Sequence, residues 1–108
     1  MNKIKSYHAH FYFNESSLED AREIYDASKS LSNVKLGNFN ERNVGPHTTW
    51  SFMIDFAVEE LVQILPWLTF NRKSLSVLVH PNSGNDLLDH TEYASWFGEK
   101  IELDISRF

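Results

Sequence analysis

Histidine is the residue type in this chain with the clearest capacity for chemistry. There are five, spread over most of the sequence: His8, His10, His47, His80 and His90. Imidazole titrates near neutral pH, and in its neutral form it binds zinc, iron, copper or nickel. The chain has no cysteine, so thiolate metal sites, iron–sulfur clusters, disulfides and cysteine nucleophiles are excluded. The histidines are therefore the candidates for a metal site or for acid–base catalysis.

The sequence around the first histidines alternates as a β-strand with one buried face does. Residues 6–13 place His8 and His10 on one face and apolar or aromatic side chains on the other. The same alternation predicts three further strands, at residues 34–40, 47–56 and 74–81. In the last two of these, His47 and His80 are again out of phase with the bulky apolar side chains. All four histidines are thus predicted on the face that does not pack against helices.

Between these strands, apolar side chains recur at the spacing of amphipathic helices. The first predicted helix covers residues 17–31, and Ser16 with Glu19 forms a capping-box signature at its start. The second predicted helix begins near Ala57, and we expect Pro66 to kink or end it.

Near the end of the chain, the pattern predicts a short helix at residues 91–97 and an additional edge or swapped strand at residues 101–108. The main order is strand–helix–strand–strand–helix–strand. This is the α+β, βαββαβ arrangement of ferredoxin-like folds, an antiparallel sheet with both helices on one face, here with an extra C-terminal strand. Right-handed crossovers set the strand order at 4-1-3-2. With no linker or repeat, residues 1–108 are expected to form a single domain.

In this topology we expect the first and third strands to run parallel, with the fourth antiparallel beside the first. His8 and His10 then lie at the same end of the open sheet face as His47 and His80. Residues two apart on a strand are separated by about 6.6 Å and neighbouring strands by about 4.8 Å, so these imidazoles can converge on one metal ion. Each histidine alone has an ordinary explanation, as a turn, a strand end or, for His90, a helix start. Their convergence from separate segments favours a shared site.

Composition narrows the classes of partner. The chain has 15 Asp and Glu residues against 10 Lys and Arg, a net charge of −5 with no basic block, which disfavours nucleic-acid binding. No apolar run approaches the roughly 20 residues of a membrane helix, and no signal-peptide pattern opens the chain. We therefore expect no membrane association and a cytoplasmic location. The open sheet face carries Tyr12, Met53 and Leu78, an apolar set that favours a homodimer.

Five short motifs are specific enough to be compared with those of a known protein family. They are His8–Phe13, Val44–His47, Leu78–Gly84, Asp89–Thr91 and Trp96–Gly98. Together they resemble the DOPA 4,5-dioxygenase family over about residues 7–98. Thr48 departs from the pattern, since relatives often have proline there. The resemblance implies a ferredoxin-like dimer that opens the ring of a catechol such as DOPA with O2 by extradiol cleavage. It also implies a non-haem metal, with Fe(II) expected and zinc or another divalent ion as the alternative in isolated protein.

The shared face and sheet end predict that His10 and His80 are metal ligands, with His47 or His8 completing the set. Of these two we assign His47 as the third ligand. Three ligands leave positions open for substrate, so the remaining histidines are free for acid–base work on the catechol hydroxyl. We assign that role to His90, a loop residue expected to reach over the open end of the sheet, and to His8.

Two questions stay open at this point. The usual iron triad includes a carboxylate, and Asp86, Asp89 and Glu99 are candidates in nearby loops, although an all-histidine site is an alternative. The function itself has two competitors: a non-catalytic dimeric module that binds a small ligand or metal, and a zinc hydrolase that uses the same ligands to activate water.

Overall fold

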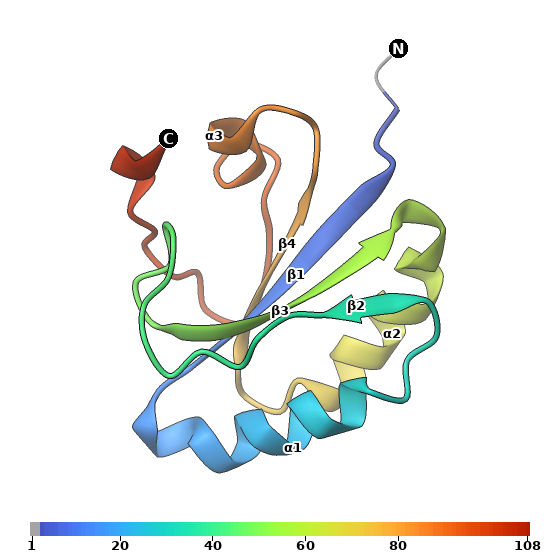
Figure 1. The fold of residues 1–108 in the computed structure, drawn as a ribbon, viewed down its shortest axis with the longest axis vertical. Helices are drawn as coiled ribbons and strands as arrows, with labels where there is room; N and C mark the ends of the chain where they lie inside the picture. Colours follow the sequence, from blue (N-terminus) through green and yellow to red (C-terminus); the bar gives the residue numbers. More distant parts are fainter. Residues whose placement is uncertain (1–2) are drawn as a thin grey trace.

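The computed structural model describes residues 3–108, which form a five-stranded sheet with helices (Figure 1). The strands are β1 (Ser6–Phe13), β2 (Val34–Leu36), β3 (Trp50–Ala57), β4 (Ser76–Pro81) and β5 (Ser95–Phe97). The helices are α1 (Leu18–Ser28), α2 (Leu61–Asn71) and α3 (Asp86–Asp89), with short 3-10 turns at Glu15–Ser17, Val58–Glu60 and Ile105–Arg107.

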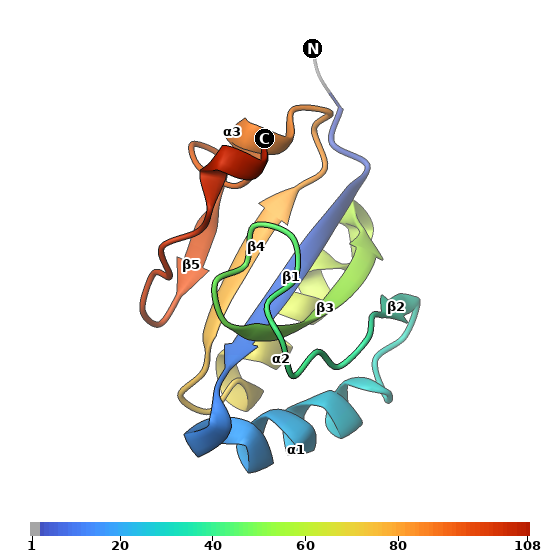
Figure 2. The ribbon, with the colours of Figure 1, turned by 60° about the vertical axis from the view of Figure 1, so that its left-hand side comes forward.

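The sheet confirms the predicted ferredoxin-like α+β fold. Its strand order is β2-β3-β1-β4-β5, which contains the predicted 4-1-3-2 order with one extra strand at the β4 edge (Figure 2). All adjacent pairs are antiparallel. The predicted apolar faces of the strands pack against α1 and α2, where Phe11, Phe52 and Ile54 meet Ile24 and Ile64 in the core. The histidine side chains lie on the opposite face of the sheet.

The predicted direction of the third strand is wrong. β3 runs antiparallel to β1, with Ser6 opposite Ala57 and Phe13 opposite Trp50. The physical reason is the order of connections: the α1 crossover makes β2 parallel to β1, and the chain then reverses before β3. The start of β3 therefore lies beside the end of β1, not beside its beginning.

Several element boundaries also differ from the prediction. Pro66 lies on the exposed side of α2 and does not end it, since the helix continues to Asn71. Asn14 caps the 3-10 turn Glu15–Ser17 by accepting hydrogen bonds from the backbone N–H groups of Ser16 and Ser17, and Ser17 is the N-cap residue of α1, so Ser16 is not the cap. β2 ends at Leu36 and β3 begins only at Trp50, which leaves a long loop between them.

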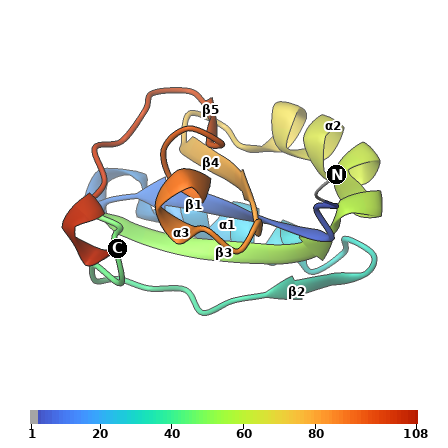
Figure 3. The same ribbon diagram turned by 90° about the horizontal axis from the view of Figure 1, so that it is seen from above.

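The C-terminal region is organised differently from the prediction. The short helix is α3, because Asn85 caps it by accepting from Leu88 N–H, and residues 95–97 form β5 instead of a helix. Residues 101–108 form no strand; they cross to the loop before β3, where Asp104 N–H donates to the Pro46 carbonyl. Figure 3 shows this C-terminal segment beside that loop. The extra C-terminal strand is therefore β5.

The open sheet face is largely covered by the chain itself. Tyr12 is 3% exposed and Leu78 is 0% exposed, and Tyr12 stacks on Trp96 of β5 with ring centroids 5.7 Å apart. These residues do not form the exposed apolar patch that favoured a homodimer. The homodimer remains a prediction that rests on the family resemblance.

Candidate metal centre

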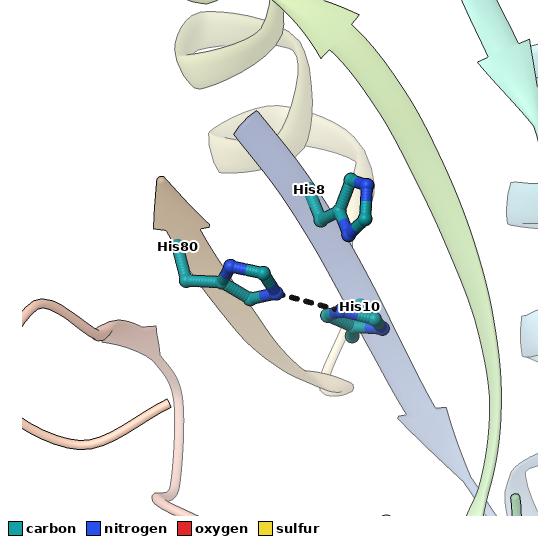
Figure 4. Close-up of side chains that lie close together, drawn as sticks. All are labelled: His8, His10 and His80. Atoms are coloured by element: carbon teal, nitrogen blue, oxygen red, sulfur yellow. Dashed lines mark hydrogen bonds between the residues drawn. The ribbon is translucent and has the colours of Figure 1, made fainter. Parts of the chain in front are cut away.

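The first three histidines of the site come from two adjacent strands. His8 of β1 lies directly opposite His80 of β4, and His10 lies two residues further along the same face of β1 (Figure 4). The Nε2 atoms of His10 and His80 are 3.0 Å apart. The ring of His8 is centred 5.7 Å from that of His10 and 5.2 Å from that of His80. Strand alternation and register alone position these three side chains.

His47 and His90 complete the cluster from outside the sheet. His47 lies in the loop before β3, and this loop folds back over the open face because the backbone turns at Val44–His47 and Tyr12 contacts the His47 Nδ1 atom at 2.7 Å. The His47 ring is centred 4.3 Å from that of His10. His90 follows α3, with its ring centred 4.2 Å from that of His80. All five histidines thus lie together, although His47 arrives by the loop and not by the predicted parallel strand.

The C-terminal segment contacts both the end of the loop before β3 and the histidine cluster. Thr48 donates its hydroxyl proton to the Glu102 carbonyl at 2.6 Å. The Phe108 ring stacks on His90, with centroids 4.7 Å apart. The departure at Thr48 from the family pattern therefore adds a contact to the C-terminal segment, which a proline could not make.

Two groups of three histidines in the described residues have ligand atoms close enough for one metal ion. One is His8, His10 and His80, the other His10, His47 and His90, and within each group the atoms lie within 4.8 Å of one another. The predicted set of His10, His47 and His80 is not one of these groups: it combines His80 from the first with His47 from the second, and His10 belongs to both. Two nitrogens that each lie about 2.1 Å from one ion are about 3.0 Å apart at a right angle and about 3.4 Å apart at a tetrahedral angle. The His10 and His80 Nε2 atoms, now hydrogen-bonded at 3.0 Å, lie in this range. The residues present therefore fit a divalent metal.

Neither group contains a carboxylate. Asp89 is buried, 1% exposed, but its carboxylate accepts hydrogen bonds from the backbone N–H and hydroxyl of Ser83, so it anchors the loop before α3. Asp86 contributes its backbone carbonyl to His90, and Glu99 lines a different cavity. Among the three carboxylates considered from the sequence, none belongs to these groups, which favours the all-histidine alternative.

Hydrogen bonds at the far side of the rings fix two of the tautomers. The Nδ1–H of His80 donates to the Pro81 carbonyl at 2.8 Å, and the Nδ1–H of His90 donates to the Asp86 carbonyl at 2.7 Å. A carbonyl can only accept, so in the neutral rings the proton is on Nδ1 and Nε2 carries the lone pair. In His80 this lone pair accepts from the Nε2–H of His10 at 3.0 Å, and it is the atom that would bind a metal. His8 differs, because its Nε2 lies 3.4 Å from the Asp55 carboxylate.

Burial keeps the central imidazoles neutral. Desolvation lowers the pKa of His10 well below its usual value, and the neighbouring histidines His47 and His80 lower it further. Desolvation also lowers the pKa of His47 and of His80 to about 4. The pKa of His8 is lowered by burial too, although Asp55 opposes this shift. At neutral pH these rings therefore present lone pairs, the form that binds metals.

These shifts predict an acid-sensitive metal-free protein. The unfolded histidines take up protons near pH 6.5, whereas folded His47 and His80 do so only near pH 4. The free energy of unfolding should therefore be highest above pH 6.5 and should fall as the pH drops from 6.5 toward 4. The loss should be roughly 3 kcal/mol for each of the two groups over the whole window. Urea denaturation with a chelator, at several pH values, measures this loss.

The matched control is His80→Gln, which removes one of the titrating groups. Its free energy of unfolding should depend on pH less steeply than that of the parent, because the variant takes up as many as one proton fewer when it unfolds. A midpoint in the parent protein that does not change between pH 7 and pH 4.5 would contradict the prediction.

Two contacts of the cluster were not predicted from the sequence. Asp55 lies directly opposite His8 in the β1–β3 register, and correct antiparallel pairing of these strands would have revealed it. Tyr12 shares the strand face of His10, but its contact with His47 depends on the loop conformation, for which the sequence has no periodic signal.

The fold and the site define a class of protein: a small ferredoxin-like domain with an all-histidine cluster on the open face of its sheet. The chain belongs to the Dopa 4,5-dioxygenase family, whose profile matches residues 7–107. The recognised resemblance is thus confirmed, and it extends to the C-terminal segment beyond Gly98.

Individual relatives agree with this assignment. The chain is 36% identical to an uncharacterized 21.2 kDa protein of Botryotinia fuckeliana over 90% of this chain and 58% of the relative. It is 31% identical to the DOPA 4,5-dioxygenase of Amanita muscaria over 97% of this chain and 50% of that enzyme. The chain therefore spans about half the length of the curated relatives it matches.

A solved structure covers nearly the same length. It is the crystal structure of a candidate dioxygenase from Nostoc punctiforme, 32% identical, with a TM-score of 0.93 over 96% of this chain and 90% of that one. The family and this structural neighbour are both named for dioxygenases.

Proposed function

We propose that this protein is a metal-dependent extradiol dioxygenase that opens the ring of a catechol, with Fe(II) as the working metal. The observation that carries the proposal is the convergence of five histidines, with the central rings held neutral, in a member of the Dopa 4,5-dioxygenase family. Its partners are then a small aromatic catechol such as DOPA, and O2.

Burial supports a division of roles among the histidines. His10, His47 and His80 are 6%, 7% and 2% exposed, as expected for residues that hold a metal away from bulk water. His8 and His90 are only half-buried, so they can exchange protons with solvent. We therefore propose the first three as ligands and the other two as acid–base groups.

Bound iron supplies the redox chemistry by which dioxygen reacts with an aromatic ring. The protein's own side chains handle the protons of the catechol. With Nδ1–H held by the Asp86 carbonyl, His90 can accept a hydroxyl proton at Nε2. His8, with Nε2 facing the Asp55 carboxylate at 3.4 Å, is oriented to pass a proton toward solvent.

The test is reconstitution with Fe(II) under anaerobic conditions, followed by oxygen and a panel of catechols. We expect one O2 consumed per catechol, both oxygen atoms in the product, one ring C–C bond broken, and a yellow semialdehyde. The control is the same protein loaded with zinc, which should consume no oxygen. Absence of oxygen uptake with every catechol in the iron-loaded protein would overturn the proposal.

One observation favours a second candidate, a zinc hydrolase. Three histidines without a carboxylate are a ligand set typical of catalytic zinc. Tight stoichiometric zinc binding, together with oxygen-independent hydrolysis of an ester, would support this candidate over the dioxygenase. A protein that binds no metal at all would instead support a non-catalytic binding module.

Location and assembly remain predictions. No helix in the described residues combines the length and apolar character that crossing a bilayer requires. The cytoplasmic location is proposed from the absence of cysteine, and the homodimer from the family resemblance.

A further inference from the structure

The outward face of α2 carries a stripe of exposed apolar side chains. Val62 and Phe70 are 84% and 85% exposed, whereas the other large apolar side chains of the described residues are at most 52% exposed. Pro66, which is also exposed, lies midway between them in the sequence. Because residues four apart lie on the same side of a helix, the three side chains form one line along α2. Single exposed apolar residues are common on protein surfaces, but aligned ones mark contact sites.

The surface of α2 differs from that of α1, the other helix that covers the sheet. The exposed residues of α1 are mostly charged: Glu19, Arg22, Glu23 and Asp26. In contrast, α2 has no charged side chain along its whole length, and its remaining exposed residues are Thr69 and Asn71. A helix face without charges is suited to contact with another protein surface, because no charge has to be removed from water there.

The symmetry of the stripe points to a second copy of this chain as the partner. Val62 lies four residues before Pro66, and Phe70 lies four residues after it. In an antiparallel pair of α2 helices related by a two-fold axis at Pro66, Val62 of each copy therefore faces Phe70 of the other. A small side chain then packs against a large one at two equivalent positions, as a self-complementary interface requires.

The charges at the two ends of α2 favour the antiparallel pair over a parallel one. The end before the stripe is acidic, with Glu59 and Glu60. The end after the stripe holds two cations and two carboxylates, which together are neutral: Arg72, Lys73, Asp20 and Glu23. Parallel pairing would place the two acidic ends against each other, whereas antiparallel pairing places each against a neutral end. It also aligns the two helix dipoles in opposite directions.

The area of the stripe sets the strength of this contact. Two nearly fully exposed side chains and a proline offer on the order of 400 Å² from each copy, since one phenylalanine accounts for about 150 Å² or more. A standard interface takes about 800 Å² from each copy, so the stripe supplies about half of it. We therefore expect a dimer that forms at micromolar concentration and dissociates on dilution.

The position of α2 keeps such an interface away from the histidine cluster. Ile64 and Leu68 of α2 pack in the core, on the face of the sheet opposite the histidines. The C-terminal turn Ile105–Arg107 and α2 lie on different sides of the molecule (Figure 1 and Figure 3). A contact through α2 leaves both histidine clusters of the dimer open to substrate, whereas a contact through the open sheet face would cover them.

We propose that this protein forms a homodimer through antiparallel contact of two α2 helices, with Val62 packed against Phe70 on both sides of a two-fold axis at Pro66. The inference specifies the interface and depends neither on the ring-cleaving function nor on the family resemblance.

Sedimentation velocity over a series of concentrations, from sub-micromolar to several hundred micromolar, tests the interface. The parent protein should show a monomer–dimer equilibrium. Phe70→Glu should raise the dissociation constant of the dimer by about tenfold or more, because it buries a charge at two positions. The matched control is Leu87→Glu, which places the same charge at an exposed leucine of α3 and should change the constant less than about twofold. Circular dichroism and metal content show that both variants stay folded with an intact cluster.

The orientation of the helices is tested by disulfide cross-linking, which the cysteine-free chain allows at single chosen positions. Pro66→Cys should form a covalent dimer readily on mild oxidation, because its two copies meet at the axis. Val62→Cys and Phe70→Cys should each cross-link slowly alone and readily when mixed. Leu87→Cys, outside the interface, should cross-link slowly in every combination.

Three results would overturn the inference. The first is a parent protein that stays monomeric at every concentration, which would assign the stripe to a different partner. The second is a dimer whose dissociation constant Phe70→Glu leaves unchanged, which would place the interface elsewhere. The third is rapid cross-linking of Val62→Cys with itself, which a parallel pair would give. None of these results bears on the proposed ring cleavage, which oxygen uptake tests separately.

Discussion

Replacing His10 with alanine is expected to abolish stoichiometric metal binding while the protein stays folded. His10 belongs to both groups of three histidines, so its loss leaves neither group with three ligands. His80→Ala should have the same effect, because the His80 Nε2 atom lies 3.0 Å from that of His10, the separation expected for two ligands of one ion. Mass spectrometry of the metal content after dialysis checks the loss of metal. Thermal unfolding of each metal-free variant checks that the protein stays folded.

The matched control is His8→Ala, which removes a half-buried histidine from the same strand and should keep the metal. The pattern across variants also identifies the ligand set. If the metal were held by His10, His47 and His90, then His80→Ala would retain it and His90→Ala would lose it. Full metal retention in both His10→Ala and His80→Ala would rule out the assignment of these residues as ligands.

The faces of the strands were predictable because a period of two leaves little freedom once one face is apolar. That pattern correctly separated Phe11 and Phe52 from His10 and His80, and it predicted that the histidines share the open face. The identity of the buried ligand candidates therefore followed from local sequence and one topology argument.

Strand direction does not follow from alternation, but it does follow from the order of connections: a crossover through α1 and a reversal before β3 make β1 and β3 antiparallel. The predicted parallel pairing of the first and third strands was wrong, yet His47 still reached the cluster, because the loop before β3 folds back over the sheet. The meeting of His47 with His10 was thus predicted correctly from an incorrect route. Loop conformations of this kind depend on tertiary contacts such as Tyr12 with His47.

The C-terminal segment shows the same limit. Residues 101–108 alternate as a strand does, but β5 already occupies the edge of β4, and residues 101–108 pair with none of the five strands. The segment instead makes single backbone contacts with the loop before β3 and places Phe108 on His90. Competition for one sheet edge is a property of the whole chain, and a local pattern cannot resolve it.

Replacing His90 with alanine is expected to lower turnover with a catechol on the order of 10²-fold or more, while metal affinity is retained. His90 lies outside the strands, and its Nδ1–H is held by the Asp86 carbonyl, so Nε2 is the atom available to accept a proton. Its ring is centred 4.2 Å from that of His80 and 6.2 Å from that of His10, at the edge of the cluster. This placement suits proton transfer to and from a substrate hydroxyl.

Phe108→Leu provides the matched control, because it removes the ring stacked on His90 but keeps the imidazole and its hydrogen bond. Turnover in this variant should fall far less than in His90→Ala. Steady-state oxygen uptake separates kcat from KM, and metal analysis of the same samples separates a proton-transfer role from ligation. A His90→Ala enzyme that turns over at the parent rate would remove His90 from the mechanism, whereas one that loses its metal would make His90 a ligand.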